Sequence, residues 1–242
     1  MYVGLGIQTA IHDHHAVQLI INLDGKFELQ SKSQGNKMFK AVLIDSDMQH
    51  ECITLNDTML ILNIAPESTI GKNLKKLYLS DTGFKSIDNK VTSSFIEALT
   101  NALRDEIDEN SIVLITEEYL YKISKAEVPL PIDDRINTVL EFLAKHDQGI
   151  IKIKEIAAKV FMSESRLIHL FTKQIGIPIR KYLLWLRLVK AIQKSFQNNN
   201  ITQAALDAGF SDAPHFNKTL KRMFGLNLTN LKSNQFIQAY WV

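Results

Sequence analysis

The sequence predicts an α+β protein of more than one domain: a small β-barrel with accompanying helices, followed by an all-helical domain. In the first 65 residues, apolar side chains recur at every second position, the period of a β-strand. From Asp133 onward they recur at every third or fourth position, the period of a helix. The charge changes at the same place: residues 1–130 hold 12 Lys and Arg against 18 Asp and Glu, and residues 131–242 hold 16 against 8.

The composition excludes several classes of protein. With 242 residues, 45% hydrophobic and 22% charged, the chain is expected to fold and not to be disordered. Its longest apolar runs, such as residues 112–115, fall far short of the roughly 20 residues that span a bilayer, and residues 1–24 lack the pattern of a signal peptide. We therefore expect a cytoplasmic protein without a membrane partner. The single cysteine, Cys52, excludes an internal disulfide and a zinc site built on several thiolates.

The first domain is expected over residues 1–90. Alternating apolar positions predict strands at 17–23, 27–30, 40–44, 51–55 and 59–64, and Asp24-Gly25 predicts a hairpin turn between the first two. Residues 91–128 follow as a helical segment, with one or two amphipathic helices over 93–125. Its apolar stripes could cover the sheet or form a homodimer; they are Phe95, Leu99 and Leu103, and Ile112, Ile115, Leu120 and Ile123. The two prolines of residues 129–132 predict a linker.

Residues 133–242 are expected to hold two helix-turn-helix units. In the first, a helix over 153–160 ends in a short turn, Ser163 stands where an N-cap belongs, and a second helix follows to Gly176. In the second, a helix over 201–208 is followed by the Gly209-Phe210 turn, Ser211 as a cap and a helix over 215–224. The helix between the units, about 20 residues and therefore roughly 30 Å long, suits the ~34 Å that separates successive major grooves of DNA.

Residues 131–242 resemble the DNA-binding domain of the AraC/XylS family of bacterial transcriptional regulators. The matching segments run from Ile156-Ala157 through 163–171, then Gly176, Tyr182 and 186–188, and continue in 209–216 and 221–225. Ala204 departs from the pattern, because the family usually has a larger aliphatic residue there, and so does Leu228, which stands where a proline usually follows the last glycine.

The resemblance implies which residues contact DNA. The implied base readers are Ser165, Ile168 and His169 with Arg166 nearby in the first unit, and Ala213, Pro214, Asn217 and Lys218 in the second. Ser, His, Asn and Lys side chains can hydrogen-bond to base edges in the major groove, whereas Ile168 and Ala213 could only touch thymine methyl groups. Phosphate contact or simple solubility better explains Thr172, Lys173, Arg187, Lys221 and Arg222.

The acidic half holds one group of possible metal ligands: His12, His14, Gln18 and His50. Their spacing resembles the two cupin motifs, although Gln18 stands in place of a glutamate, and Asp45, Asp47 and Thr54 replace the proline, glycine and asparagine of the second motif. The strand pattern opposes a metal site. If Val17 and Leu19 mark the core face of a regular strand, His12 and His14 point away from it and His15 points in. A bulge, or a barrel covered on both faces, would remove that conflict.

We therefore predict a sequence-specific transcriptional regulator that is not an enzyme, with a cupin-like sensing domain and no cofactor other than a possible divalent metal. The expected partners are double-stranded DNA, the transcription machinery, an unidentified effector and a second copy of the chain. The main alternative is a cupin-type metalloenzyme or metal-binding protein with an accessory DNA-binding module. A non-specific DNA-packaging protein is disfavoured by the net charge of only +2.

Overall fold

The computed structural model describes residues 1–6, 9–14, 16–31, 35–54, 57–66, 68–80, 82–126, 132–145, 151–175, 177–198 and 200–224. The chain divides into two compact units, one built on Met1–Val128 and the other on Pro129–Leu220. Most of the predicted linker and the predicted positions His15, Gly176, Gly225 and Leu228 lie outside the described residues. Within the described part of the chain, no helix is long and apolar enough to cross a membrane.

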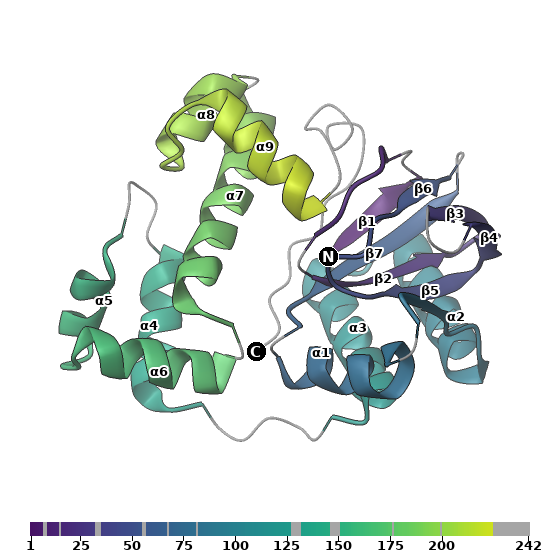
Figure 1. Cartoon of the computed structure of the whole chain (residues 1–242), viewed down its shortest axis with the longest axis horizontal. Coiled ribbons are helices and arrows are strands. Elements are labelled where there is room, and N and C mark those ends of the chain that lie inside the picture. The colour runs from purple at the N-terminus through teal and green to yellow at the C-terminus, as the bar shows by residue number, and fades with distance from the viewer. Residues whose placement is uncertain are drawn as a thin grey trace. The chain divides into compact units, whose positions relative to one another are not determined.

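The first unit contains two antiparallel sheets (Figure 1). The five-stranded sheet has the order β1-β7-β2-β5-β8, and the three-stranded sheet has the order β4-β3-β6. Their strands are β1 (Tyr2–Leu5), β2 (Val17–Asn22), β3 (Phe27–Ser31), β4 (Gly35–Phe39), β5 (Ala41–Ile44), β6 (Glu51–Ile53), β7 (Thr58–Ile64) and β8 (Phe84–Ser86). The sequence prediction missed β1, β4 and β8, which are short and carry little alternation.

The predicted hairpin at Asp24-Gly25 is wrong, although the turn is real. β2 pairs with β5 and β7, whereas β3 pairs with β4 and β6, so the turn carries the chain from one sheet to the other. Asn22 shapes it, because its Oδ1 accepts hydrogen bonds from the backbone N–H groups of Asp24 at 2.9 Å and Gly25 at 2.8 Å. Turn chemistry therefore identified the bend without identifying the pairing of the strands on either side.

Strand β2 is buried on both faces, and this corrects the expected direction of its side chains. Val17, Leu19 and Ile21 join the cluster of apolar residues that also includes the helices. Gln18 and Ile20 have the opposite parity, and Ile20 packs with Phe27 and Leu29 of the other sheet. The less apolar face of the strand pattern is therefore the interior between the two sheets.

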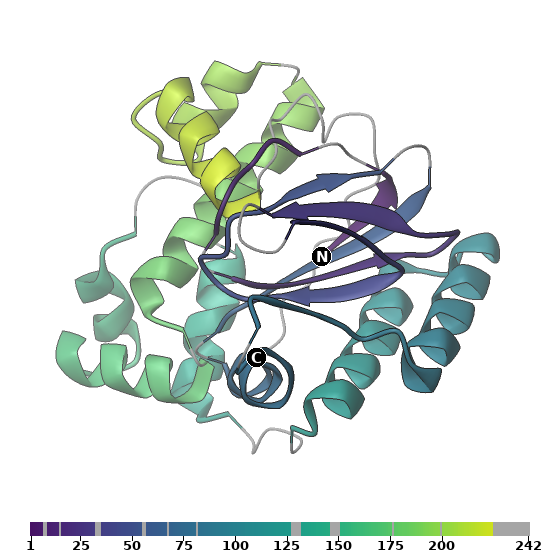
Figure 2. The same cartoon turned by 45° about the vertical axis from the view of Figure 1, so that its right-hand side comes forward.

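Helices cover the outer face of the five-stranded sheet (Figure 2). They are α1 (Thr69–Leu74), the π-helical turn η1 (Lys75–Leu79), α2 (Lys90–Arg104) and α3 (Glu109–Ser124). On α2 and α3, Phe95 and Tyr119 stack with ring centroids 4.1 Å apart, and Leu99 is fully buried. The apolar stripes predicted for a dimer interface thus belong mainly to the unit's own core, because the sheet needs a cover and these helices supply it.

The second unit is all helical. It contains α4 (Asp134–Lys145), α5 (Ile153–Lys159), α6 (Glu164–Ile175), α7 (Ile179–Asn198), α8 (Ile201–Asp207) and α9 (Ala213–Phe224), the last of which continues past Leu220. Leu167, Phe171 and Tyr182 are part of one buried cluster that joins α4 to the first helix-turn-helix unit. Ala204 is buried with 1% of its surface exposed, so the smaller residue at this position is still packed. The first part with sheets and helices and the helical second part agree with the predicted α+β multidomain class, whereas closure of the two sheets into a barrel stays a prediction.

Candidate nucleic-acid interface and histidine cluster

Helices α5 and α6 form the first helix-turn-helix unit. The backbone N–H of Met162 donates to the carbonyl of Ala157 at 3.0 Å, which closes the turn after α5. Ser163 caps α6 as predicted, because its Oγ accepts from the backbone N–H of Arg166 at 3.3 Å. Phe161, just before Met162, has a positive φ of 52°. Local hydrogen bonds thus fix the angle at which α6 leaves the turn.

Helices α8 and α9 repeat this arrangement. The backbone N–H of Phe210 donates to the carbonyl of Ala205 at 3.0 Å, and Gly209 has a positive φ of 87°. The predicted cap at Ser211 is wrong by one residue: Asp212 accepts from the backbone N–H of His215 at 2.6 Å. The Ser211 hydroxyl instead donates to Asp212 at 3.0 Å. The sequence pattern misplaced the cap because the second turn is one residue longer than the first.

Each second helix has one buried and one exposed face. Leu167 and Phe171 of α6, and Phe216 and Leu220 of α9, are fully buried at four-residue spacing. The opposite faces carry the side chains that the resemblance implies for base reading. On α6 and α9, exposed side chains are Ser165, Arg166, His169, Lys173, Pro214, Asn217, Lys218, Lys221 and Arg222, and partly exposed ones are Ile168, Thr172 and Ala213. All of these predicted residues are therefore accessible to a ligand.

Helix α7 connects the two units. It contains 20 residues from Ile179 to Asn198, which corresponds to about 30 Å of helix. Its apolar residues Ile179, Val189 and Ile192 are buried. The structure thus supplies a continuous helical connector of the length that the sequence predicted.

A basic groove borders the first helix-turn-helix unit, and the sequence predicts only one of its cations as a DNA contact. The groove has a volume of about 460 Å³ and is lined by Ile151, Lys152, Ile153, Lys154, Glu164, Arg180, Leu183, Leu184 and Arg187. Arg187 was predicted as a phosphate contact. Lys152, Lys154 and Arg180 were missed because they lie outside the recognition helix. The alternation of Ile with Lys over 151–154 was the only signal for the two lysines.

In the first unit of the chain, three histidines from two segments lie together. Backbone hydrogen bonds hold the segments, since His12 and His50 each donate an N–H to the other's carbonyl at 3.0 Å. The ring centroids of His12 and His50 are 4.4 Å apart, and those of His14 and His50 are 5.1 Å apart. Their exposed fractions are 8%, 2% and 1% for His12, His14 and His50. Residues 9–14 form no regular strand apart from this bridge, so the parity argument against the cluster does not apply.

The fourth predicted ligand, Gln18, lies beside the same cluster. Its Oε1 is 3.1 Å from Nε2 of His50, and its Nε2 donates to Oδ1 of Asn63 at 2.9 Å. Burial is the main cause that lowers the pKa of His12 to about 4 and that of His50 to about 3, and it also lowers the pKa of His14. All three imidazoles are therefore neutral at neutral pH.

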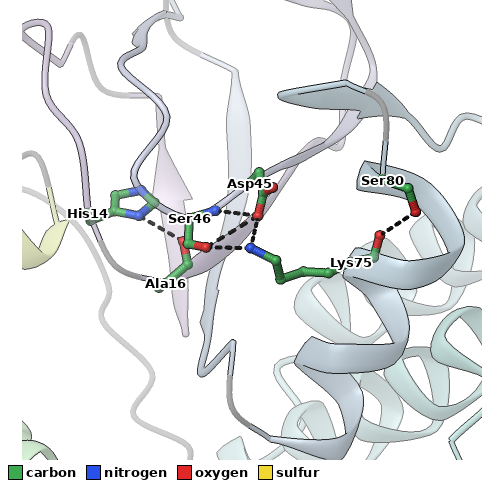
Figure 3. Close-up of polar contacts among 6 residues, drawn as sticks. All are labelled: His14, Ala16, Asp45, Ser46, Lys75 and Ser80. Carbon is green, nitrogen blue, oxygen red and sulfur yellow. Dashed lines mark hydrogen bonds and ion pairs between the residues drawn. The ribbon is translucent and has the colours of Figure 1, made fainter.

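The degraded second cupin-like motif has a structural role. Asp47 has a positive φ of 61°, at the place where the motif has a glycine. The carboxylate of Asp45 receives hydrogen bonds from Lys75 and from the backbone N–H of Ser46, as Figure 3 shows. Asp45 is thus engaged with η1 and not with the histidines.

Comparisons with known proteins agree with the helix-turn-helix geometry. Residues 156–234 match the family described as a helix-turn-helix domain. The chain is 25% identical to the probable transcriptional regulator LumQ of Photobacterium leiognathi, over 90% of each chain. It is 31% identical to an uncharacterized helix-turn-helix-type transcriptional regulator of Staphylococcus aureus, but over 37% of this chain and only 12% of that protein.

Among solved structures, the chain is similar in fold to ToxT of Vibrio cholerae. One ToxT structure, bound to (E)-4-(8-methylnaphthalen-1-yl)but-3-enoic acid, superposes with a TM-score of 0.53 at 12% identity and covers 95% of this chain and 98% of that one. A second superposes with a TM-score of 0.52 at 12% identity, over 93% and 94%. This likeness concerns the fold.

Two helix-turn-helix units joined by a long helix, each with an exposed polar reading face, define a DNA-binding transcriptional regulator. The matched domain, residues 156–234, is of the AraC type, and the chain is related in sequence to one probable transcriptional regulator over 90% of its length.

Proposed function

We propose that this regulator reads DNA with α6 and α9 in major grooves. The observation that carries the proposal is the repeated exposed face at equivalent positions: Ser165, Ile168 and His169 on α6 correspond to Pro214, Asn217 and Lys218 on α9. His169, Asn217 and Lys218 supply hydrogen-bonding groups for base edges, with Asn suited to adenine and Lys to guanine. The face is polar because bases, and not other side chains, are its partners.

We further propose that the basic groove positions the first helix-turn-helix unit on the DNA backbone. Lys152, Lys154, Arg180 and Arg187 surround it, and Glu164 is the one acidic side chain among the described residues that line it. Cations on either side of a recognition helix contact phosphates in helix-turn-helix complexes and carry no base information. The same phosphate-contacting role is proposed for Lys173 on α6 and for Lys221 and Arg222 on α9.

Selection of bound DNA by the full-length protein tests the base-reading proposal. We expect an enriched site whose preferences at separate positions change with His169→Ala and with Lys218→Ala, each costing about 1–3 kcal/mol of specific binding. Lys122→Ala, on the exposed surface of α3, is the matched control and should leave affinity unchanged. Enrichment of no sequence would contradict the proposal, and parental binding by either variant would remove that residue from it.

The first unit, in this proposal, is a cupin-like sensing domain that controls DNA binding in the cytoplasm and the response of the transcription machinery. Support comes from the ToxT-like fold, since a ToxT structure carries a bound small carboxylic acid. The alternative, a metalloenzyme with an accessory DNA-binding module, draws its support from the histidine cluster. The two candidate functions differ in catalysis: a metalloenzyme would convert a substrate in the absence of DNA, and a sensing domain would not.

A homodimer is also part of the proposal, through a different surface from the one first predicted. Phe95 and Leu99 are buried, but Leu114 on α3 is 64% exposed and Tyr121, two turns further, is partly exposed. Light scattering of the full-length protein at tens of micromolar should give the mass of a dimer. Leu114→Asp should reduce it to a monomer without loss of helical structure, and an unchanged dimer would move the interface elsewhere.

A further inference from the structure

Three nitrogen lone pairs converge in a buried part of the first unit, and no described residue donates a hydrogen to them. Each imidazole places Nδ1 against a backbone carbonyl oxygen: His12 against Ala10 at 2.8 Å, His14 against Ala16 at 3.0 Å, and His50 against Met48 at 2.8 Å. A carbonyl oxygen only accepts, so each Nδ1 must carry the hydrogen, and each Nε2 of these neutral rings keeps its lone pair. Figure 3 shows the His14 contact.

Among the described residues, none donates a hydrogen bond to the three Nε2 atoms. Those of His12 and His14 are buried and have no hydrogen-bond partner among the described residues. That of His50 faces Oε1 of Gln18 at 3.1 Å, and an amide oxygen is also an acceptor. A buried acceptor without a donor is destabilising, and native structures rarely hold three of them at one place.

We propose that His12, His14 and His50 bind one divalent transition-metal ion through Nε2, with the amide oxygen of Gln18 at its edge. A cation satisfies every converging lone pair at once. The Nδ1–H contacts with backbone carbonyls are the second-shell arrangement that orients metal-binding histidines. A ring nitrogen from each histidine already lies within 4.8 Å of the other two, and a tetrahedral ion with bonds of about 2.0–2.1 Å needs them about 3.4 Å apart.

The ligand types select the metal. Three imidazoles suit Zn²⁺, Ni²⁺, Cu²⁺ or Fe²⁺, whereas Mg²⁺ and Ca²⁺ require carboxylate and carbonyl oxygens. Cys52 supplies no thiolate, because it packs in the apolar cluster between the sheets and burial raises the pKa of its thiol. All four groups are uncharged, so the ion keeps its full double charge.

The site would give the regulator a metal as its effector, and this step alone rests on the proposed function. Metal binding would join residues 12 and 14 to the segment before β6 and so rigidify one end of the first unit. We expect the affinity for the selected DNA site to differ at least threefold between the metal-free and metal-loaded protein.

Metal titration of the untagged full-length protein is the test. After removal of bound metals, Zn²⁺ or Co²⁺ should bind with one equivalent per chain and raise the unfolding temperature, and Co²⁺ should develop the visible absorption of a nitrogen-ligated tetrahedral ion. His14→Ala and His50→Gln should abolish that equivalent, and His215→Gln, which changes a histidine of the second unit, should retain it. Circular dichroism establishes that each variant is folded. Absence of stoichiometric binding, or binding unaffected in folded His14→Ala and His50→Gln, would overturn the proposal.

Gln18→Glu separates a metal site from a purely structural cluster. Beside a divalent ion, the added carboxylate should lower the Kd for Zn²⁺ at least tenfold, which corresponds to about 1.4 kcal/mol. If the cluster is purely structural and binds no ion, the same buried carboxylate has no cation partner within it. The substitution then leaves the Kd for Zn²⁺ unchanged. An unchanged Kd would therefore count against the ligand set. Specific DNA binding by the metal-free protein tests the proposed function separately, because it involves none of these residues.

Discussion

Phe161 and Gly209 occupy the same place in the two helix-turn-helix turns, and both adopt a left-handed backbone. Their φ angles are 52° and 87°, and each precedes the residue whose N–H closes the turn onto the helix before it. Glycine reaches this conformation without cost, whereas a residue with a Cβ is strained by about 1–2 kcal/mol. The side chain of Phe161 is 97% exposed, so packing does not compensate for the strain.

Phe161→Gly should therefore stabilise the second unit by about 0.5–1 kcal/mol, since the relief of strain exceeds the added flexibility of the unfolded chain. Denaturant unfolding followed by far-UV circular dichroism measures the change. Gly209→Ala is the reciprocal control and should destabilise by a similar amount. A less stable Phe161→Gly variant would show that the exposed ring makes a favourable contact.

The Asp212 cap predicts a pH-dependent stability for α9. Hydrogen bonds from the backbone N–H of His215 and from Ser211 lower the pKa of the Asp212 carboxyl. Its folded pKa lies below its unfolded pKa, so this stabilisation is present above the unfolded pKa, near 4, and is lost as the pH falls through the folded value.

Asp212→Ala should lower the unfolding temperature at pH 7, and the difference from the parent should shrink below pH 4. Asn caps helices about as well as Asp but does not ionise, so Asp212→Asn should stay near the parent at pH 7 and remove the pH dependence. Thermal melts between pH 3 and pH 7 measure both effects. A constant difference across this range would mean that the carboxylate charge is not involved.

The two halves of the chain differed in how far the sequence predicted them. In the second half, cap residues, turn glycines and helical spacing are local, so α5 to α9 agree with expectation except at the start of α9, which begins at Ala213 and not at His215 and whose cap is Asp212 and not Ser211. In the first half, strand pairing depends on distant residues. Nothing local distinguishes a hairpin at Asp24-Gly25 from a crossing between sheets, and a strand covered on both faces, such as β2, gives no reliable alternation.

The same dependence on distant residues explains why the sequence did not predict how the histidines are oriented. Their spacing predicted which residues form the group of candidate ligands. The orientation of His12 and His14, however, depends on the loop before β2 and on the bridge to His50, and no sequence pattern within 9–16 encodes either. The basic groove was missed for a similar reason, because Lys152 and Arg180 meet only after α5 and α7 are folded.

A hydrogen bond between α2 and α3 gives a prediction for the first unit. The hydroxyl of Tyr119 lies 2.9 Å from Oγ1 of Thr92, which itself donates to the carbonyl of Ile87 at 2.6 Å. Tyr119→Phe keeps the stacking on Phe95 and should cost about 1 kcal/mol. Tyr119→Ala removes the stacked ring as well and should cost about 3–5 kcal/mol.

Tyr121→Phe is the matched control for this pair, because Tyr121 lies on the same helix but is partly exposed. It should change the free energy of unfolding by less than about 0.5 kcal/mol. Equal effects of Tyr119→Phe and Tyr121→Phe would contradict a specific role for the bond to Thr92.

Lys218 and Lys221 should differ in kind, although both are exposed on α9. Lys218 shares the face of Asn217 and corresponds to His169 of α6, so it is proposed to read a base, whereas Lys221 lies about one turn further on and is proposed to contact phosphate. Lys221→Ala should weaken binding to all sequences alike and reduce the slope of log affinity against log salt by about 1. Lys218→Ala should relax the preference at one base pair of the selected site. Binding isotherms on the selected site and on single-base variants, at several salt concentrations, distinguish them; loss of base preference in Lys221→Ala would exchange the two roles.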